Sequence, residues 1–123
     1  MFKSNTDTLD LIGQSGTHFQ FRMCEFDSMQ EIDEAVKNFT KSGLYLFAQR
    51  YSKPNDPRYW YSLKYIGETD NYSNRKYSNH HKKQEIEKAK SNAWGYCIIT
   101  EDDDKRKGFE SDLIARYNPP CNG

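Results

Sequence analysis

The sequence predicts an α+β domain, built from a small, mainly antiparallel β-sheet flanked by helices. Strand-like runs occur in pairs joined by short turns, which favours hairpins, and helix-like segments separate or follow these pairs. The length of 123 residues suits one domain with a modest core. Only 35% of the residues are hydrophobic, but 15% are aromatic, and aromatic rings can bury enough area to hold such a core.

The first third of the chain is predicted to form a hairpin and a short helix. Residues 7–24 read as two strands, with GQSG at 13–16 as the turn and HFQFRM alternating as a strand does. Residues 29–39 place apolar side chains at helical spacing, which predicts a short amphipathic helix.

Two further strands are predicted at residues 43–51 and 59–66, separated by the breaker-rich segment SKPNDPR. A turn centred at Asn55 would place Tyr45 directly opposite Tyr65. Directly opposed residues share one face of a sheet, so we expect the two rings side by side. Such a pair can serve either packing or a functional site.

A helix is predicted over residues 70–90, because polar residues can cap its start and neither Gly nor Pro interrupts it. Ile86 marks the face that packs on the sheet, and Arg75 lies on that same face. An inward guanidinium needs an anion or several acceptors, either a salt bridge with Glu110 or a phosphate. On this helix His80 lies about 140° from Arg75, so it is not expected to share that site.

The C-terminal segments are predicted as a strand at 93–100 and a helix at 103–117 that ends before two prolines. Glu110 borders the apolar stripe of this helix. A carboxylate in this position is either paired with a cation such as Arg75 or holds a metal ion. The stripe itself consists of Phe109, Leu113, Ile114 and Tyr117.

Composition limits the function classes. The formal net charge is zero, but residues 71–92 hold six basic and two acidic side chains, whereas residues 1–36 hold two basic and seven acidic ones. The basic segment is either a phosphate-facing stripe or an ordinary solvated helix. No apolar run is long enough to span a membrane. Three cysteines without CxxC spacing argue against a disulfide framework or zinc finger, and favour a reduced, cytoplasmic location.

Four blocks of sequence in order resemble the GIY-YIG nuclease superfamily. They are GLY at 43–45, YIG at 65–67, Arg75 ten residues after the second tyrosine, and FESDLIARYNPPCN at 109–122. Within this superfamily, the sequence resembles a group of small stand-alone bacterial and phage proteins. The resemblance implies a three-stranded core at 43–123. Residues 1–42 would be an N-terminal extension, packed on the core as part of one globular domain.

The resemblance also implies a function, namely metal-dependent hydrolysis of DNA phosphodiester bonds. Glu110 would bind one divalent cation, Mg²⁺ or Mn²⁺, Arg75 would contact the phosphate, and Tyr45 would help to activate water. Tyr65 would line the same site, and Asn122 would hold the C-terminal tail against it.

A tyrosine has an ordinary pKa near 10. We therefore expect Tyr45 to relay a proton rather than exist as a free phenolate, with His80 as a candidate terminal acceptor. Asn79 occupies the position, four residues after the arginine, where relatives often have His or Tyr. The residues expected to contact substrate are Gly67, Lys76, Asn79, His81, Lys82 and Lys83.

DNA is the partner that the resemblance implies. The sequence does not decide whether RNA is also a substrate, and it does not indicate the oligomeric state. One alternative is a catalytically inactive nucleic-acid-binding module on the same fold, although such a module would not need Glu110. Another is a small interaction protein whose motifs only build the core, which would not explain an inward arginine facing a carboxylate.

Overall fold

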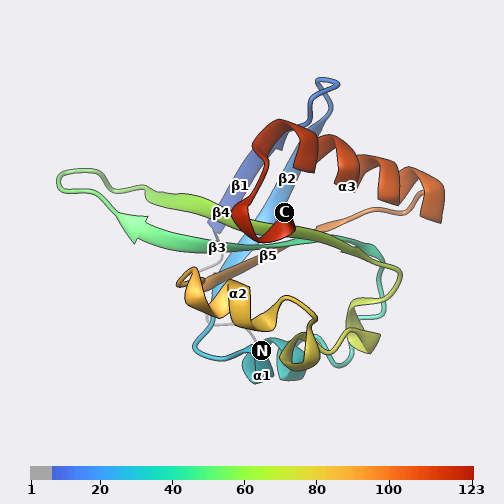
Figure 1. The fold of residues 1–123 in the computed structure, drawn as a ribbon, viewed down its shortest axis with the longest axis horizontal. Helices are drawn as coiled ribbons and strands as arrows, with labels where there is room; N and C mark the ends of the chain where they lie inside the picture. The colour runs from blue at the N-terminus through green and yellow to red at the C-terminus, as the bar shows by residue number, and fades with distance from the viewer. Residues whose placement is uncertain (1–6) are drawn as a thin grey trace.

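The computed structural model describes residues 7–123 and contains a five-stranded antiparallel sheet in the order β1-β2-β5-β3-β4 (Figure 1). The predicted α+β class is therefore confirmed. The strands are β1 (Asp7–Ile12), β2 (His18–Glu25), β3 (Gly43–Ser52), β4 (Tyr59–Thr69) and β5 (Ala93–Ile98). The helical segments are α1 (Met29–Ala35), η1 (Tyr72–Asn74), η2 (Tyr77–Asn79), α2 (Lys83–Lys88), α3 (Asp103–Tyr117) and η3 (Pro120–Asn122).

The N-terminal hairpin extends the sheet, as the sequence predicts. β1 and β2 are joined by the GQSG turn, where Gly16 has a φ of +92°. β2 then pairs with β5, which connects the hairpin to the other strands. The division into an extension at 1–42 and a core at 43–123 stays a prediction, and residues 1–6 of that extension lie outside the described part of the chain.

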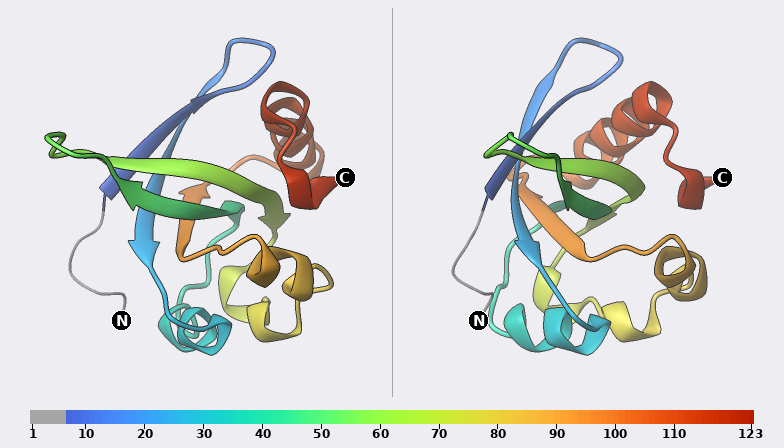
Figure 2. Two further views of the ribbon diagram at one scale, coloured as in Figure 1. Left: turned by 60° about the vertical axis from the view of Figure 1, so that its left-hand side comes forward. Right: turned by 90° about the vertical axis from the view of Figure 1, so that its left-hand side faces the viewer.

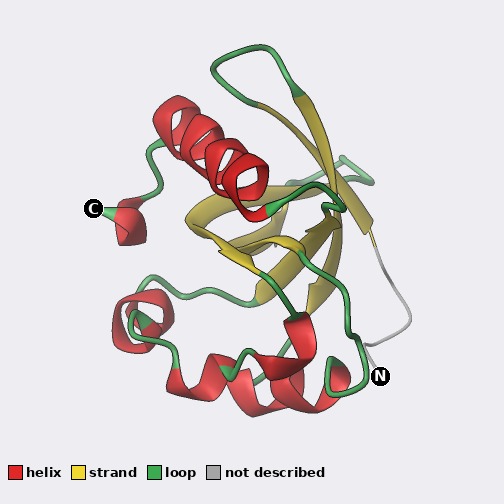
Figure 3. Cartoon of the chain, turned by 90° about the vertical axis from the view of Figure 1, so that its right-hand side faces the viewer, coloured by secondary structure: helices red, strands yellow, loops and turns green. Residues whose placement is uncertain are grey.

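Each face of the sheet has its own hydrophobic core. In Figures 1 and 3, α3 covers one face, and α1, α2 and the short turns η1 and η2 lie on the other. The α3 face buries aliphatic side chains such as Leu44, Leu46 and Leu113. The opposite face is aromatic and buries Tyr45, Phe47, Tyr72, Tyr77 and Trp94.

The β3–β4 hairpin has a different register from the predicted one. Tyr45 pairs with Gly67, and Tyr65 pairs with Phe47. Two one-residue shifts add up: near the tip Ser52 pairs with Tyr59, one residue from the predicted register, and Lys64 forms a β-bulge that adds a second shift. A bulge inserts one unpaired residue and shifts every pair beyond it. The displacement at Tyr45 is two residues, so Tyr45 and Tyr65 keep the same face and are diagonal neighbours.

The predicted helix over 70–90 is wrong. The segment forms the two 3₁₀ turns η1 and η2, followed by the short helix α2. Each turn has the sequence YSN. Asn and Ser side chains bond to nearby backbone groups and so compete with the α-helix; the Asn71 side chain accepts a hydrogen bond from the backbone N–H of Ser73 at 3.0 Å.

α3 spans the predicted residues. Asp102 caps it by accepting from the backbone N–H of Lys105 at 2.9 Å. It ends where Asn118 adopts a left-handed conformation before Pro119. Among residues 7–123, no helix is long and apolar enough to cross a membrane.

Candidate functional site

Tyr45 is the centre of the candidate site. Its side chain projects from near the start of β3 and is fully buried. Its ring centroid lies 6.1 Å from that of Tyr65, so the two predicted neighbours do meet.

Gly67 leaves room for this ring. A Cβ atom on Gly67 would lie 2.4 Å from Cζ of Tyr45 and 2.6 Å from its hydroxyl oxygen. Any side chain at position 67 would therefore displace the Tyr45 ring. Gly67 was expected to contact substrate; in the structure its open side is filled by the Tyr45 ring.

Arg75 points inward, as the sequence suggested, but from the loop after η1 and not from a helix. Its Nη2 donates to the hydroxyl oxygen of Tyr45 at 2.9 Å. The alternative of a salt bridge with Glu110 is not seen within residues 7–123; the side-chain partner of Arg75 there is Tyr45. The other guanidinium N–H groups of Arg75 make no hydrogen bond with any described residue.

His80 also contacts Tyr45, contrary to the helical expectation. Its Nε2 lies 2.8 Å from the Tyr45 hydroxyl oxygen, and its ring is buried. The segment can bring Arg75 and His80 to one atom because it bends after each 3₁₀ turn. A continuous helix would have separated them.

The tautomer of His80 follows from its second hydrogen bond. The backbone N–H of Lys82 donates to Nδ1 of His80 at 3.0 Å, so Nδ1 carries no proton. In the neutral ring the proton is then on Nε2, which donates to Tyr45. Burial, together with the nearby Arg75 and His81, lowers the pKa of His80 to about 4, so the ring is neutral at pH 7. This arrangement does not fit His80 as a terminal proton acceptor.

The Tyr45 hydroxyl oxygen thus accepts hydrogen bonds from two donors, and the hydroxyl is protonated before substrate binds. Burial raises its pKa far above the ordinary value near 10, although the Arg75 guanidinium acts in the opposite direction. With both acceptor positions of the hydroxyl in use, its own O–H is available to donate.

Glu110 approaches from the other face of the sheet. α3 packs against β4, the edge strand, and carries the partly buried Glu110. Burial raises the pKa of Tyr65; Glu110 raises it further, and Arg75 lowers it. Burial also raises the pKa of Glu110, and Glu68 adds to that effect. Glu110 forms no hydrogen bond or ion pair with any residue in the described range.

Arg106 is a site-adjacent residue that sequence reasoning missed. It is almost fully buried, and its Nε donates to Glu68 at 2.7 Å. Because Arg106 precedes Glu110 by one helical turn, this pair fixes α3 against the end of β4 next to Glu110. The sequence did contain a signal for this role, because Arg106 lies at helical spacing from the apolar stripe of the same helix.

Asn122 clamps the outer edge of β4. Its side-chain amide accepts from the backbone N–H of Ile66 and donates to the Ile66 carbonyl, both at 2.9 Å. It therefore holds the tail beside Tyr65, the place that the resemblance implies. It does not contact the Tyr45 hydroxyl.

Several of the other residues expected to contact substrate lie at the surface beside His80, where Asn79, His81 and Lys83 line a hollow together with it. Lys76, Asn79 and His81 are exposed, and Lys82 and Lys83 are partly exposed. The roles of these residues, like those of the residues at the centre of the site, stay predictions.

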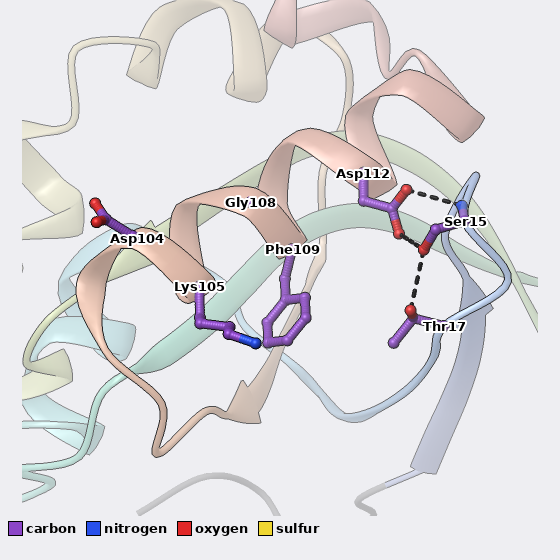
Figure 4. Close-up of a pocket in the computed structure, with 7 residues that line it drawn as sticks. All are labelled: Ser15, Thr17, Asp104, Lys105, Gly108, Phe109 and Asp112. Carbon is purple, nitrogen blue, oxygen red and sulfur yellow. Dashed lines mark hydrogen bonds between the residues drawn. The ribbon is translucent and has the colours of Figure 1, made fainter.

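A second hollow lies between the β1–β2 turn and α3, away from Tyr45 (Figure 4). There Asp112 accepts from the backbone N–H of Ser15 at 2.9 Å and from the Ser15 hydroxyl at 2.7 Å, which ties the turn to the helix. None of the candidate-site residues lines this hollow, which is formed by Ser15, Thr17, Asp104, Lys105, Gly108, Phe109 and Asp112.

The donor set suits a hard divalent cation bound through few protein ligands. No group of three or more His, Cys, Asp or Glu side chains positioned for a metal occurs among residues 7–123. Glu110 nevertheless offers a partly buried carboxylate without a partner in this range; Glu68 raises its pKa, whereas Arg75, Lys107 and Arg106 lower it. Mg²⁺ retains most of its water and needs only one or two carboxylates.

Comparison with known proteins supports the fold. No model of a protein family matches the chain, and no curated protein does. A solved structure does match: the GIY-YIG N-terminal endonuclease domain of UvrC from Thermotoga maritima, a tyrosine-to-phenylalanine mutant bound to its catalytic divalent cation. The TM-score is 0.52 and the identity 19%, over 76% of this chain and 97% of that domain. The chain therefore has the GIY-YIG fold.

Proposed function

We propose that this protein is a metal-dependent endonuclease that hydrolyses phosphodiester bonds of DNA. One observation carries the proposal: the Tyr45 hydroxyl receives hydrogen bonds from both Arg75 and His80, and the neighbouring Tyr65 feels the charge of Glu110, whose carboxylate has no partner among residues 7–123. The fold shared with the endonuclease domain of UvrC supports it.

Tyr45 takes part in activating the attacking water. Because burial keeps its proton in place at rest, a free phenolate is not its starting state. The O–H proton of Tyr45 passes to a non-bridging oxygen of the bound phosphate, and the attacking water gives its proton to the Tyr45 oxygen. The two donors stabilise the negative charge that develops on this oxygen between the two transfers. His80 acts as one of these donors, in place of the acceptor role expected from the sequence.

Arg75 binds the scissile phosphate. Its guanidinium is held over Tyr45 by one hydrogen bond and has further N–H donors that no described residue uses. A planar guanidinium matches the oxygens of a phosphate and can donate to two of them. Arg75 therefore positions the phosphate next to Tyr45.

Glu110 would hold the divalent cation, and this cation would neutralise charge on the phosphate oxygens and assist the leaving oxygen. Ionised Glu110 is disfavoured by burial and by Glu68. Cation binding should therefore weaken as the pH falls and Glu110 takes up a proton. Lys76, Lys82 and Lys83 would contact the DNA backbone beside the site, without reading sequence.

The proposal is tested by incubating supercoiled plasmid with Mg²⁺ or Mn²⁺ and the wild type, Glu110→Gln or Glu87→Gln. Glu87 lies on α2 and is exposed, so Glu87→Gln is a control for the same chemical change. We expect nicking by the wild type and the control, no nicking with a chelator, and a rate at least about 100-fold lower for Glu110→Gln.

Equal rates for Glu110→Gln and the wild type would refute the metal role of Glu110. Binding of DNA by the wild type without cleavage under any of these conditions would refute the nuclease and favour the catalytically inactive binding module.

A further inference from the structure

The distal half of the β3–β4 hairpin forms an arm, which we define as residues 49–62. In Figures 1 and 2 this hairpin projects beyond the other strands and the helices. Three large hydrophobic side chains are exposed within residues 7–123, and two of them, Tyr51 and Tyr59, lie on the arm. Exposed aromatic rings on a projecting element indicate a binding surface more often than isolated exposed residues do.

One side of the arm is continuous with the candidate site. Side chains alternate between faces along a strand, and β3 has no bulge, so Tyr51 lies on the same face of β3 as Tyr45. Tyr51 pairs with Trp60, which therefore shares this side. Lys53 joins it, because its Nζ lies 3.7 Å from the centroid of the Trp60 ring. We call Tyr51, Lys53 and Trp60 the site-side strip.

The strip is positively charged and not neutralised locally. Lys53 forms no ion pair with any described residue. The one acidic side chain of the arm, Asp56, is bound by Arg58 at 3.0 Å and by Nε1 of Trp60 at 3.1 Å. These bonds order the tip around Trp60 and leave the Lys53 charge without a carboxylate partner.

The opposite side of the arm anchors it to the sheet. Arg50 is buried there, donates to Glu25 of β2 at 2.6 Å, and lies 4.0 Å from the centroid of the Tyr59 ring. Asn92 adds two hydrogen bonds to the backbone of Arg50. The base of the arm is thus fixed, and the strip has a defined position relative to Tyr45.

We propose that the site-side strip binds duplex DNA at a distance from the bond that is cut, with Lys53 on a phosphate and the Tyr51 ring against the sugars. This inference rests on the proposed function. Tyr51 follows Tyr45 by six residues, or about 20 Å at roughly 3.3 Å per residue. With about 3.4 Å per base pair, the strip meets the duplex about six base pairs from the scissile phosphate.

Tyr51 and Tyr59 offer a matched test, since they are 41% and 39% exposed and lie on opposite sides of the arm. Binding of a labelled 30-base-pair duplex is measured by fluorescence anisotropy in EDTA, so that no cleavage occurs. We expect Tyr51→Ala to raise the Kd about fivefold or more, and Tyr59→Ala to change it less than about twofold. Equal effects of the two substitutions, with both variants folded, would overturn the proposal.

The contribution of Lys53 is tested through salt. Lys53→Gln should lower the slope of log Kd against log salt concentration by about 0.9, the value for one phosphate contact. Lys37→Gln removes an exposed charge from α1, remote from the arm, and should leave the slope unchanged. An unchanged slope for Lys53→Gln would contradict the phosphate contact.

Duplex length separates this inference from the nuclease proposal. With fewer than about six base pairs on one side of the cut, Tyr51→Ala should bind like the wild type. If the wild type cleaves DNA and Tyr51→Ala does not change binding of the long duplex, DNA binding by the strip is refuted and the nuclease proposal stands. If Tyr51→Ala weakens binding but the wild type cleaves no DNA, binding by the strip is supported and the nuclease proposal is refuted. An equal Tyr51 effect on single strands would overturn the assignment to duplex DNA.

Discussion

At the scale of single residues, the hydroxyl oxygen of Tyr45 organises the site. Arg75 and His80 both donate to it, and Gly67 makes space for its ring. Arginine and histidine are both present in the sequence, but their convergence on one oxygen depends on the loop conformation between them. The GLY and YIG motifs indicated the two tyrosines, and they could not indicate the tautomer of His80.

His80 makes stability depend on pH. In the unfolded chain its pKa is near 6.5, and in the folded protein burial, with Arg75 and His81, lowers it to about 4. Between these values the unfolded state binds a proton that the folded state does not, so stability falls as the pH decreases from 6.5 towards 4. His80→Gln should reduce this loss, as measured by urea unfolding across that range.

The exposed His18 on β2 provides the control. His18→Gln should lose stability with falling pH as the wild type does. If His80→Gln and the wild type showed the same pH dependence, His80 would not be the buried, neutral donor described above.

At the scale of elements, α1 holds the segment that carries Arg75 and His80. Asp33 of α1 accepts from the backbone N–H of Tyr77 at 2.6 Å and of Ser78 at 3.3 Å, and so caps η2. The N-terminal third of the chain therefore has a role in positioning the site. Its sequence matched no functional motif, because a capping aspartate on a short helix has no distinctive pattern.

Asp33→Ala should destabilise the fold by about 1–2 kcal/mol, the usual effect of losing a helix cap. It should also slow DNA cleavage, since Arg75 and His80 lose the support of η2. Urea unfolding and a cleavage assay measure the two effects. Glu34→Ala on the same helix removes only an exposed pair with Lys37 and should leave both nearly unchanged; similar effects of both substitutions would contradict the capping role.

The five strands and α3 could be predicted because alternation, turn residues and prolines are local signals. The segment at 70–90 could not be predicted in the same way. It lacks Gly and Pro, so it passes the test for a helix, but its Asn and Ser side chains favour 3₁₀ turns. The repeated YSN was the signal that could have corrected the prediction.

At the scale of the whole molecule, the site is assembled across the edge of the sheet. Arg75 and His80 reach Tyr45 from the aromatic face, whereas Glu110 comes from α3 on the aliphatic face. β4 is the edge strand between them, and Asn122 closes its outer side. Groups from both faces can meet only at such an edge.

This arrangement explains which parts of the site the sequence could not reveal. The order of strands depends on long-range pairing, and the bulge at Lys64 changes the register by an amount that no local pattern records. From the sequence, a salt bridge between Arg75 and Glu110 was one of the two alternatives for each residue. In the structure Arg75 donates to Tyr45, and the Glu110 carboxylate has no partner within the described residues.

The central claim is that the Tyr45 hydroxyl takes part in cleaving DNA, and Tyr45→Phe tests it most directly. Tyr77→Phe is the matched control, because Tyr77 is equally buried, lies 5.2 Å away between ring centroids, and has a hydroxyl without a hydrogen-bond partner in the described structure. The measurement is the single-turnover rate of cleavage of a bound DNA duplex. We predict a rate at least about 100-fold lower for Tyr45→Phe, with binding and folding retained, and an unchanged rate for Tyr77→Phe. Cleavage by Tyr45→Phe at the wild-type rate would contradict the claim.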